Sequence, residues 1–229
     1  MSATKSIGTK KEKSLHAALK LQYAGDHGIV EAAVGQFVCD ALKADGDIIE
    51  VQTGNFGSIK KKLMQLTKTN KVTLVHPIPH SRTIEVRDTK GILIRRRKSP
   101  IRGSAWDLFS ELIRAPLLPL TPGLTIELVF VDETELRIDD GAGSWRRKGV
   151  SIVDRRLDAV RDTIVLADCL AYRRFLPEAL PLEFSGKELA VTVPVRAVLA
   201  RKALYVLKRI GLVEEIGKKG NSKVYRKAY

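Results

Sequence analysis

The sequence has few of the residues that cross-link a chain or anchor it in a membrane. Two cysteines, Cys39 and Cys169, occur in 229 residues, without a Cys-x-x-Cys pair or a Cys/His cluster. A disulfide framework and a structural zinc site are therefore excluded, and we expect both thiols to be buried in a reducing cytoplasm. No apolar run reaches the length of about 20 residues that spans a bilayer. The basic start, MSATKSIGTKKEKS, lacks the apolar segment of a signal peptide, so we expect neither secretion nor membrane insertion.

Acidic residues are also scarce relative to basic ones. The chain has 40 Lys and Arg against 26 Asp and Glu, which gives a formal net charge of +14. Such an excess favours a polyanionic partner, and nucleic acid is the commonest polyanion in a cytoplasm. Hydrophobic residues make up 44% of the chain, enough to bury a core, so a wholly disordered protein is not expected.

The first third of the chain alternates between helical and strand patterns. After a basic lead over residues 1–13, which we expect to be disordered, Ser14 is a candidate N-cap and Gly25 a stop signal for the first helix. A turn at Asp45–Gly46 separates the second and third strands. A helix between the third and fourth strands is what a parallel crossover requires. The pattern predicts helix, three strands, helix and strand, over the ranges 14–25, 29–34, 36–44, 47–54, 56–69 and 71–78.

The rest of the chain divides near Pro177, where the character of the sequence changes. Before it the pattern predicts strands at 81–88, 91–97 and 125–138 and helices at 104–114 and 153–166. After it the pattern predicts two helices and a β-hairpin, at 184–190, 195–211 and 212–227. We therefore expect an α/β domain over residues 14–175 and a small domain over residues 176–229.

Two carboxylates are expected to meet on neighbouring strands. Side chains alternate between faces along a strand, so Glu50 and Gln52 share one face. If the chain turns at Asp45–Gly46, Asp40 on the preceding strand lies near Glu50. Carboxylates among apolar residues repel each other and lose hydration, so a positive charge is expected between them. Mg²⁺ or Mn²⁺ meets this requirement, and beside a phosphodiester it would activate a water molecule. A solvated strand face is the alternative interpretation.

The spacing Asp40–x9–Glu50–x–Gln52, set in the order helix, three strands, helix, strand, resembles the core of the PD-(D/E)XK nuclease superfamily. The resemblance covers residues 14–78 and implies a restriction-endonuclease-like α/β fold with a mixed sheet. It also implies that Asp40, Glu50 and the Val51 carbonyl bind the metal ion, and that Gln52 orients the attacking water.

The same resemblance implies that His16 or Glu31 supplies the ligand nearest the first helix. The chain departs from the family pattern at two positions, where Cys39 replaces proline and Gln52 replaces lysine. An amide carries no charge and cannot act as a base. We therefore expect a metal-dependent DNA endonuclease, with a catalytically inactive DNA-binding regulator of the same fold as the alternative. A protein-interaction adaptor is a third interpretation.

Runs of basic residues indicate where nucleic acid would bind. Arginine contacts phosphate strongly and in a salt-sensitive manner. A solvated surface is the alternative explanation for any charge run. In the first domain, phosphate contacts are expected from Lys60, Lys61, Lys62, Arg95, Arg96, Arg97, Arg146 and Arg147.

Residues 184–229 resemble a winged helix-turn-helix, in which 195–211 is the recognition helix and the hairpin is the wing. From Arg196 to Tyr229 ten Lys and Arg stand against two Glu. The resemblance implies DNA contacts by Arg196, Arg201, Lys202, Lys218, Lys219 and Lys223. The segments SLHAALK, IEVQTG, RRRKSP, SWRRKG and GKKGN are similar to those of an uncharacterised bacterial family that joins a PD-(D/E)XK-like domain to a winged helix. DNA is thus the expected partner, and a homodimer is a further candidate assembly.

Overall fold

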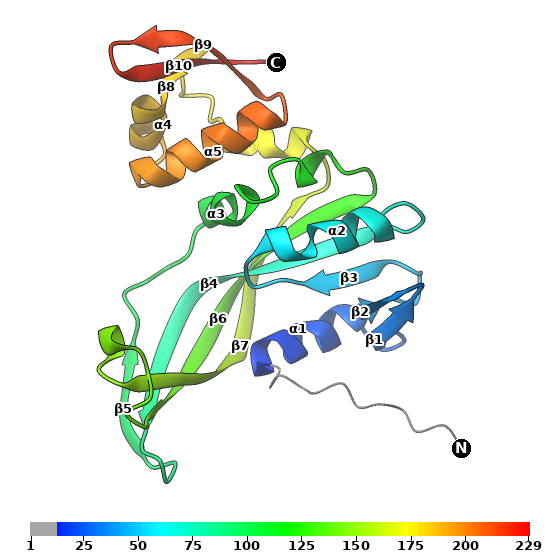
Figure 1. Ribbon diagram of the computed structural model, residues 1–229, viewed down its shortest axis with the longest axis vertical. Helices are drawn as coiled ribbons and strands as arrows, with labels where there is room; N and C mark the ends of the chain where they lie inside the picture. The colour runs from blue at the N-terminus through cyan, green and yellow to red at the C-terminus, as the bar shows by residue number, and fades with distance from the viewer. Residues whose placement is uncertain (1–12) are drawn as a thin grey trace.

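A seven-stranded mixed sheet forms the centre of the protein (Figure 1). The computed structural model describes residues 13–229, so the prediction of a disordered lead over residues 1–13 lies outside the described residues, Lys13 excepted. The strand order is β1-β2-β3-β4-β6-β7, and β5 pairs with β4. The bounds are β1 (Ile29–Val34), β2 (Phe37–Leu42), β3 (Ile48–Val51), β4 (Val72–Arg87), β5 (Leu93–Lys98), β6 (Leu124–Asp139) and β7 (Val150–Leu166). The expected α/β class with a mixed sheet is confirmed.

The order of elements over the first third of the chain agrees with the prediction. Helix α1 (Ser14–Ala24) precedes β1, β2 and β3, and helix α2 (Phe56–Leu66) connects β3 to the parallel strand β4. Gly25, with φ at 65°, ends α1 as expected. Ser14 is not the N-cap. It is the first residue of α1, and its hydroxyl donates to Asp154 on β7 instead.

Helices α1 and α2 cover opposite faces of the sheet (Figure 1). Ile49 and Val51 of β3 belong to the same apolar cluster as Leu19 of α1. Ile48 of the same strand belongs to the cluster that contains Leu63 of α2. Because side chains alternate along a strand, each side chain of β3 packs either against α1 or against α2.

The second half of the sheet corrects two predictions. One continuous strand, β4, replaces the two strands expected at 71–78 and 81–88, with a bulge between Pro79 and Ser81. Residues 153–166 were expected to be helical but belong to β7. Pairing with β6 along nearly the whole of β7 outweighs the local helical pattern. These long strands therefore extend the first sheet and do not form a separate domain.

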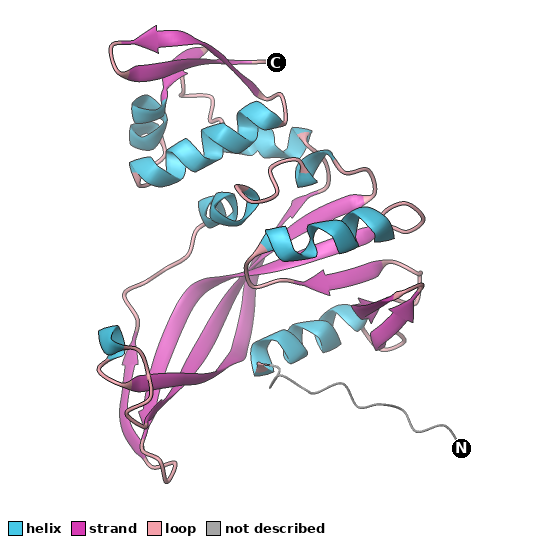
Figure 2. Ribbon diagram, in the orientation of Figure 1, coloured by secondary structure: helices cyan, strands magenta, loops and turns pink. Residues whose placement is uncertain are grey.

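The outer halves of the long strands form an arm that projects from the body (Figure 2). We use the term arm for residues 81–98 and 132–159. Its buried carboxylates are paired, since Arg82 Nε lies 2.5 Å from Glu133 Oε1 and Arg155 Nη2 lies 3.0 Å from Glu135 Oε2. These ion pairs supply the counter-charge that a buried carboxylate needs.

The last part of the chain has the predicted order of two helices and a hairpin, and we call residues 183–227 the C-terminal module. Its strands pair in the order β8-β10-β9. Ser185 caps the first helix, because its hydroxyl accepts from Glu188 N–H while the Glu188 carboxylate accepts from Ser185 N–H. The bounds are β8 (Glu183–Ser185), α4 (Gly186–Thr192), α5 (Ala197–Arg209), β9 (Val213–Lys219) and β10 (Ser222–Lys227). The likeness of this module to a winged helix stays a prediction.

An aromatic cluster joins the C-terminal module to the sheet. Helix α3 (Leu108–Leu112) lies between α2 and α5. The ring of Phe109 packs 5.7 Å from Trp106 and 4.8 Å from Phe175, measured between centroids. One apolar cluster runs from Leu63 of α2 through Phe109 to Leu199 of α5. The two parts of the chain therefore share a core.

The two cysteines differ in their exposure to solvent. Cys39 is buried as predicted, but Cys169 is only half-buried, and neither forms a disulfide. No helix in the described part of the chain is long and apolar enough to cross a membrane.

Candidate functional site

Strand β2 twists at Asp40. Cys39 and Ala41, two residues apart, would share a face in a regular strand. Instead Cys39 belongs to the apolar cluster beneath α2 and Ala41 to the cluster beneath α1. The ladder between β2 and β3 ends at Ala41 opposite Ile49. Beyond that point Asp40 Oδ2 accepts the Val51 N–H at 2.8 Å, so a side chain takes the place of a backbone acceptor.

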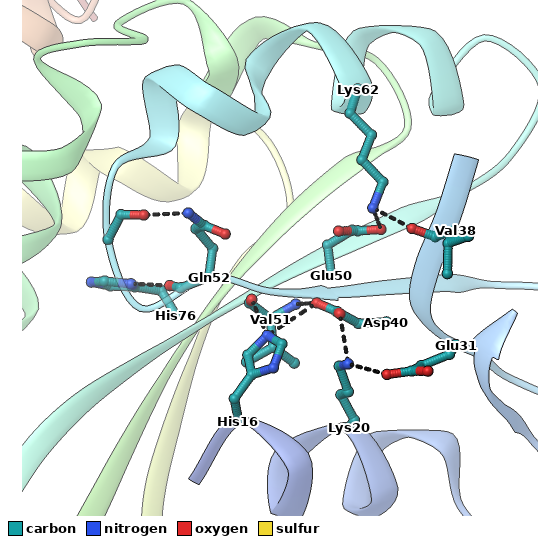
Figure 3. A network of polar contacts seen from close by, with 11 residues as sticks. His16, Lys20, Glu31, Val38, Asp40, Glu50, Val51, Gln52, Lys62 and His76 are labelled. Atoms are coloured by element: carbon teal, nitrogen blue, oxygen red, sulfur yellow. Dashed lines mark hydrogen bonds and ion pairs between the residues drawn. The ribbon is translucent and has the colours of Figure 1, made fainter. Parts of the chain in front are cut away.

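Two basic side chains of α1 hold the Asp40 carboxylate (Figure 3). Lys20 Nζ lies 3.2 Å from Asp40 Oδ1 and 3.3 Å from Glu31 Oε1 on β1. His16 Nε2 lies 3.3 Å from Asp40 Oδ2 and 2.8 Å from the Val51 carbonyl oxygen. Burial acts to raise the pKa of Asp40, but hydrogen bonds from His16 and Val51 N–H and the charge of Lys20 hold it below its ordinary value. Asp40 is thus ionised at neutral pH.

Glu50 faces α2, on the other side of the sheet (Figure 3). It is 2% exposed, and Lys62 Nζ lies 2.5 Å from its Oε1. This contact is an ion pair, because Oε1 has no aligned hydrogen bond within residues 13–229, whereas Lys62 donates to the Val38 carbonyl at 2.7 Å. Burial raises the pKa of Glu50 although Lys62 opposes the shift. Burial and the charge of Glu50 also raise the pKa of the Cys39 thiol to about 11, which makes it a poor nucleophile.

The prediction that Asp40 and Glu50 meet at one point is wrong. The twist of β2 sends Asp40 to α1, whereas Glu50 points to α2. A positive charge is present, as expected, but Lys20 and Lys62 supply it separately on the two faces. The predicted donors, Asp40, Glu50 and the Val51 carbonyl, do not fit one Mg²⁺ or Mn²⁺, since a single ion cannot reach both faces of a strand. Among residues 13–229 no group of three or more His, Cys, Asp or Glu could hold a metal ion.

Gln52 lies on the same side of β3 as Glu50 but forms no hydrogen bond with either carboxylate within the described residues (Figure 3). Its side-chain Nε2 donates to the Gly54 carbonyl in the turn that follows β3. Its backbone carbonyl accepts from Nδ1 of the buried His76 at 2.7 Å. The amide therefore stabilises the turn between β3 and α2. Of the five predicted catalytic side chains, the structure brings together three, namely His16, Glu31 and Asp40.

Lys20 is the residue of this site that the sequence analysis missed. It lies four positions after His16, so both side chains share one face of α1. It is 5% exposed and follows Leu15 and Leu19, which are buried. A lysine in an apolar stripe cannot be fully hydrated and needs a carboxylate partner, and this spacing is the signal that could have revealed it.

A family model described as "Domain of unknown function (DUF8091)" matches residues 13–167. The chain belongs to this family. The DUF8091 match ends one residue beyond β7, so it covers the whole seven-stranded sheet with its two helices. A protein of Treponema pallidum (strain Nichols), described as an uncharacterized protein, is 31% identical over 221 residues, or 96% of this chain and 87% of that protein. The similarity to that relative therefore extends into the C-terminal module. No solved structure matches the chain.

Two of the predicted phosphate contacts of this DUF8091 chain are directed inward. Lys62 pairs with the buried Glu50 and is not available as a phosphate-binding side chain on α2. Lys202 is a predicted DNA contact, but its Nζ donates to the Ser110 hydroxyl of α3 at 3.1 Å. Lys202 therefore helps to fix the C-terminal module to the body.

The other predicted cations lie at the surface of the described residues. Lys60 and Arg147 are half-buried, and Arg147 Nε donates to the Val150 carbonyl at 3.1 Å. Lys223 pairs with Glu215 at 3.0 Å. The exposed residues are Lys61, Arg95, Arg96, Arg97, Arg146, Arg196, Arg201, Lys218, Lys219 and Lys223.

A positively charged cleft of about 420 Å³ opens in the C-terminal module between α4, α5 and the hairpin tip. Three cations, Lys187, Arg201 and Lys223, converge on it, and none of its lining residues is acidic. Ala197, Leu204 and Tyr225 supply the apolar part of its lining. The lining consists of Gly186, Lys187, Ala197, Arg201, Leu204, Asn221, Ser222, Lys223 and Tyr225.

Proposed function

We propose that this protein binds duplex DNA through its C-terminal module and that the nuclease-like sheet serves as a scaffold without metal-dependent cleavage. The observation that carries the proposal is the cleft lined by Lys187 and Arg201, which form no ion pair within the described residues, together with Lys223, which pairs with Glu215 outside the lining. A phosphate backbone satisfies such a cluster, and the order of α5 followed by the β9–β10 hairpin supports the interpretation of α5 as a recognition helix and the hairpin as a wing.

The charges around this cleft support the proposal. Within the described residues, Arg196, Arg201, Lys218 and Lys219 form no ion pair, so their charge is not neutralised internally. Asp40 and Glu50 of the sheet, by contrast, are each paired with a lysine. Unpaired positive charge is therefore present in the C-terminal module, and also on the arm, where Arg95 and Arg97 are exposed and form no ion pair within the described residues.

Adjacent residues of α5 provide a matched test. Arg201 is exposed at the cleft, whereas Lys202 contacts Ser110. We expect Arg201→Ala to weaken duplex affinity about 10-fold and to lower the slope of log K against log salt by about 1. Lys202→Ala removes the same formal charge and should leave affinity nearly unchanged. Equal loss in both variants, measured by fluorescence anisotropy on a labelled duplex, would refute this docking surface.

A metal-dependent endonuclease is the second candidate, favoured by one observation. At the end of the β2–β3 ladder, His16 Nε2 lies 3.3 Å from Asp40 Oδ2 and 2.8 Å from the Val51 carbonyl oxygen, and these are three of the groups to which the PD-(D/E)XK resemblance assigns the metal. Supercoiled plasmid with Mg²⁺ or Mn²⁺ separates the two candidates. The scaffold proposal predicts no nicking by the parent protein. Nicking that Asp40→Ala abolishes would replace it with the endonuclease.

A further inference from the structure

Trp145 is a large apolar side chain that the fold leaves in solvent. It is 82% exposed, in a 3₁₀ turn (Trp145–Arg147) at the end of the arm where β6 passes into β7. Tryptophan is usually well buried, because the exposure of its large apolar ring to water is unfavourable compared with burial in the protein. Its one ring contact within residues 13–229 is the guanidinium of Arg146, which lies 5.5 Å from the ring centroid.

The loop that carries Trp145 is closed by its own backbone. Gly143 N–H donates to the Gly149 carbonyl at 2.7 Å, and Gly149 N–H donates to the Ser144 carbonyl at 3.3 Å. A Cβ at Gly143 would lie 2.0 Å from the Val150 carbonyl oxygen, so only glycine permits this close approach. Asp140 accepts from Ala142 N–H at 3.0 Å. The exposed ring is thus presented by a hydrogen-bonded loop.

The side chains next to the ring are basic, whereas the acidic side chains of the loop, Asp139 and Asp140, precede Ala142, and Asp140 accepts from Ala142 N–H and the Ser151 hydroxyl. Arg146, Arg147 and Lys148 follow Trp145 directly, and residues 144–150 contain no acidic side chain. Apolar residues are few within the loop, since only Ala142 accompanies Trp145 between residues 139 and 149. One aromatic ring among cations matches a stacked base with its flanking phosphates, whereas a membrane surface would also engage the exposed Ile92, Leu93 and Ile94 of the same arm.

We propose that Trp145 stacks on an unpaired base of nucleic acid while Arg146 and Arg147 contact the neighbouring phosphates. In a continuous duplex both faces of each base are covered, so the ring face can engage only a base that lacks a stacked neighbour. The inference rests on the proposed DNA binding and deepens it, because it assigns gapped or single-stranded segments as the substrate class of the arm.

Intrinsic fluorescence provides a direct readout, since the chain has two tryptophans. In a Trp106→Phe background the signal comes from Trp145 alone. We expect a single-stranded oligonucleotide and a gapped duplex to quench this signal, and a continuous duplex of equal length to leave it nearly unchanged. Neutral and anionic phospholipid vesicles are the comparison ligands, and quenching or a blue shift with vesicles alone would overturn the inference.

Affinity gives an independent test. We expect the gapped duplex to bind about 10-fold more tightly than the continuous one, and Trp145→Ala to abolish that preference. Trp145→Phe should retain part of it because a smaller ring still stacks. Leu21→Ala, which removes another exposed apolar side chain (65%), is the matched control and should change nothing. An unchanged preference in Trp145→Ala, with duplex binding intact, would overturn this inference alone. Loss of all DNA binding by the parent protein would overturn the proposed function as well.

Discussion

Lys62 lies between solvent and the buried carboxylate of Glu50. Replacing Lys62 should therefore destabilise the fold mainly because Glu50 is left without a counter-charge. The Lys62 side chain is 23% exposed and that of Glu50 is 3% exposed. In Lys62→Met, Glu50 loses its counter-charge, and we expect the free energy of unfolding at pH 7 to fall by about 2–3 kcal/mol. The double variant Lys62→Met/Glu50→Gln should recover most of this loss. Urea unfolding measures both, and an equal loss in the single and double variants would show that the pair is not coupled.

The two carboxylates should give the stability opposite dependences on pH. The pKa of Asp40 is lowered by folding, so its contribution is present above its ordinary value of 3.8 and is lost as pH falls through the folded pKa. The pKa of Glu50 is raised from 4.5, so folding favours its protonated form. Its contribution to stability is present below pH 4.5 and is lost as pH rises through the raised pKa of the folded state. Asp40→Asn should therefore be less stable than the parent at pH 7, by about 1–2 kcal/mol, with a smaller difference near pH 3. Glu50→Gln should gain relative to the parent as pH rises above 4.5. Unfolding curves at several pH values check both signs, and parallel behaviour of the two variants would contradict the separate environments.

For individual residues, the sequence correctly predicted that the two carboxylates need positive charge, but it did not predict which face of the sheet Asp40 occupies. Buried carboxylates at positions 40 and 50 do require positive charge, and the structure supplies it from Lys20 and Lys62. The alternation rule correctly placed Glu50, but it assumes a regular β2. Because Cys39 and Ala41 face opposite layers, the rule fails at the residue between them.

At the scale of elements, the approach of α1 to β2 depends on Gly28. A Cβ there would lie 2.2 Å from the Ala24 carbonyl oxygen and 2.8 Å from the Leu42 carbonyl oxygen, both rigid backbone atoms. We expect Gly28→Ala to lower the free energy of unfolding by about 2–3 kcal/mol. Gly54→Ala is the matched control, since its nearest neighbour is a Glu111 oxygen at 3.6 Å and its change should be within about 0.5 kcal/mol. Urea midpoints compare the two, and similar shifts would contradict the packing argument.

Local patterns predicted the short elements and failed for the long ones. Helices α1, α2 and α5 and the hairpin follow from apolar spacing and glycine stops, which act over a few residues. Strand β7 does not, because its pairing partner β6 lies more than ten residues away in sequence and decides its conformation through the antiparallel backbone ladder between them. The continuity of β4 past Pro77 is likewise set by its neighbours in the sheet.

At the scale of the whole molecule, the charge of +14 indicated a polyanionic partner but not where it would bind. Some cations, such as Lys62 and Arg82, are paired with buried carboxylates and are therefore not available to bind a polyanion. The fold leaves others at two distant places, the cleft of the C-terminal module and the end of the arm. A contact surface of this kind is a property of the tertiary arrangement, because Lys187 and Lys223 are brought together only by the pairing of β8 with β10.

The shared core predicts that the sheet and the C-terminal module unfold together. Phe109 is fully buried between them, with Trp106 and Phe175 around it. Phe109→Ala should lower the free energy of unfolding by about 3–5 kcal/mol and keep a single transition, because the cavity weakens both parts at once. The neighbouring Ile113, 38% exposed, should cost less than about 1 kcal/mol when changed to alanine. Far-ultraviolet circular dichroism and tryptophan fluorescence should give coincident curves for the parent and both variants, and a second transition confined to either part would show that the two cores are separate.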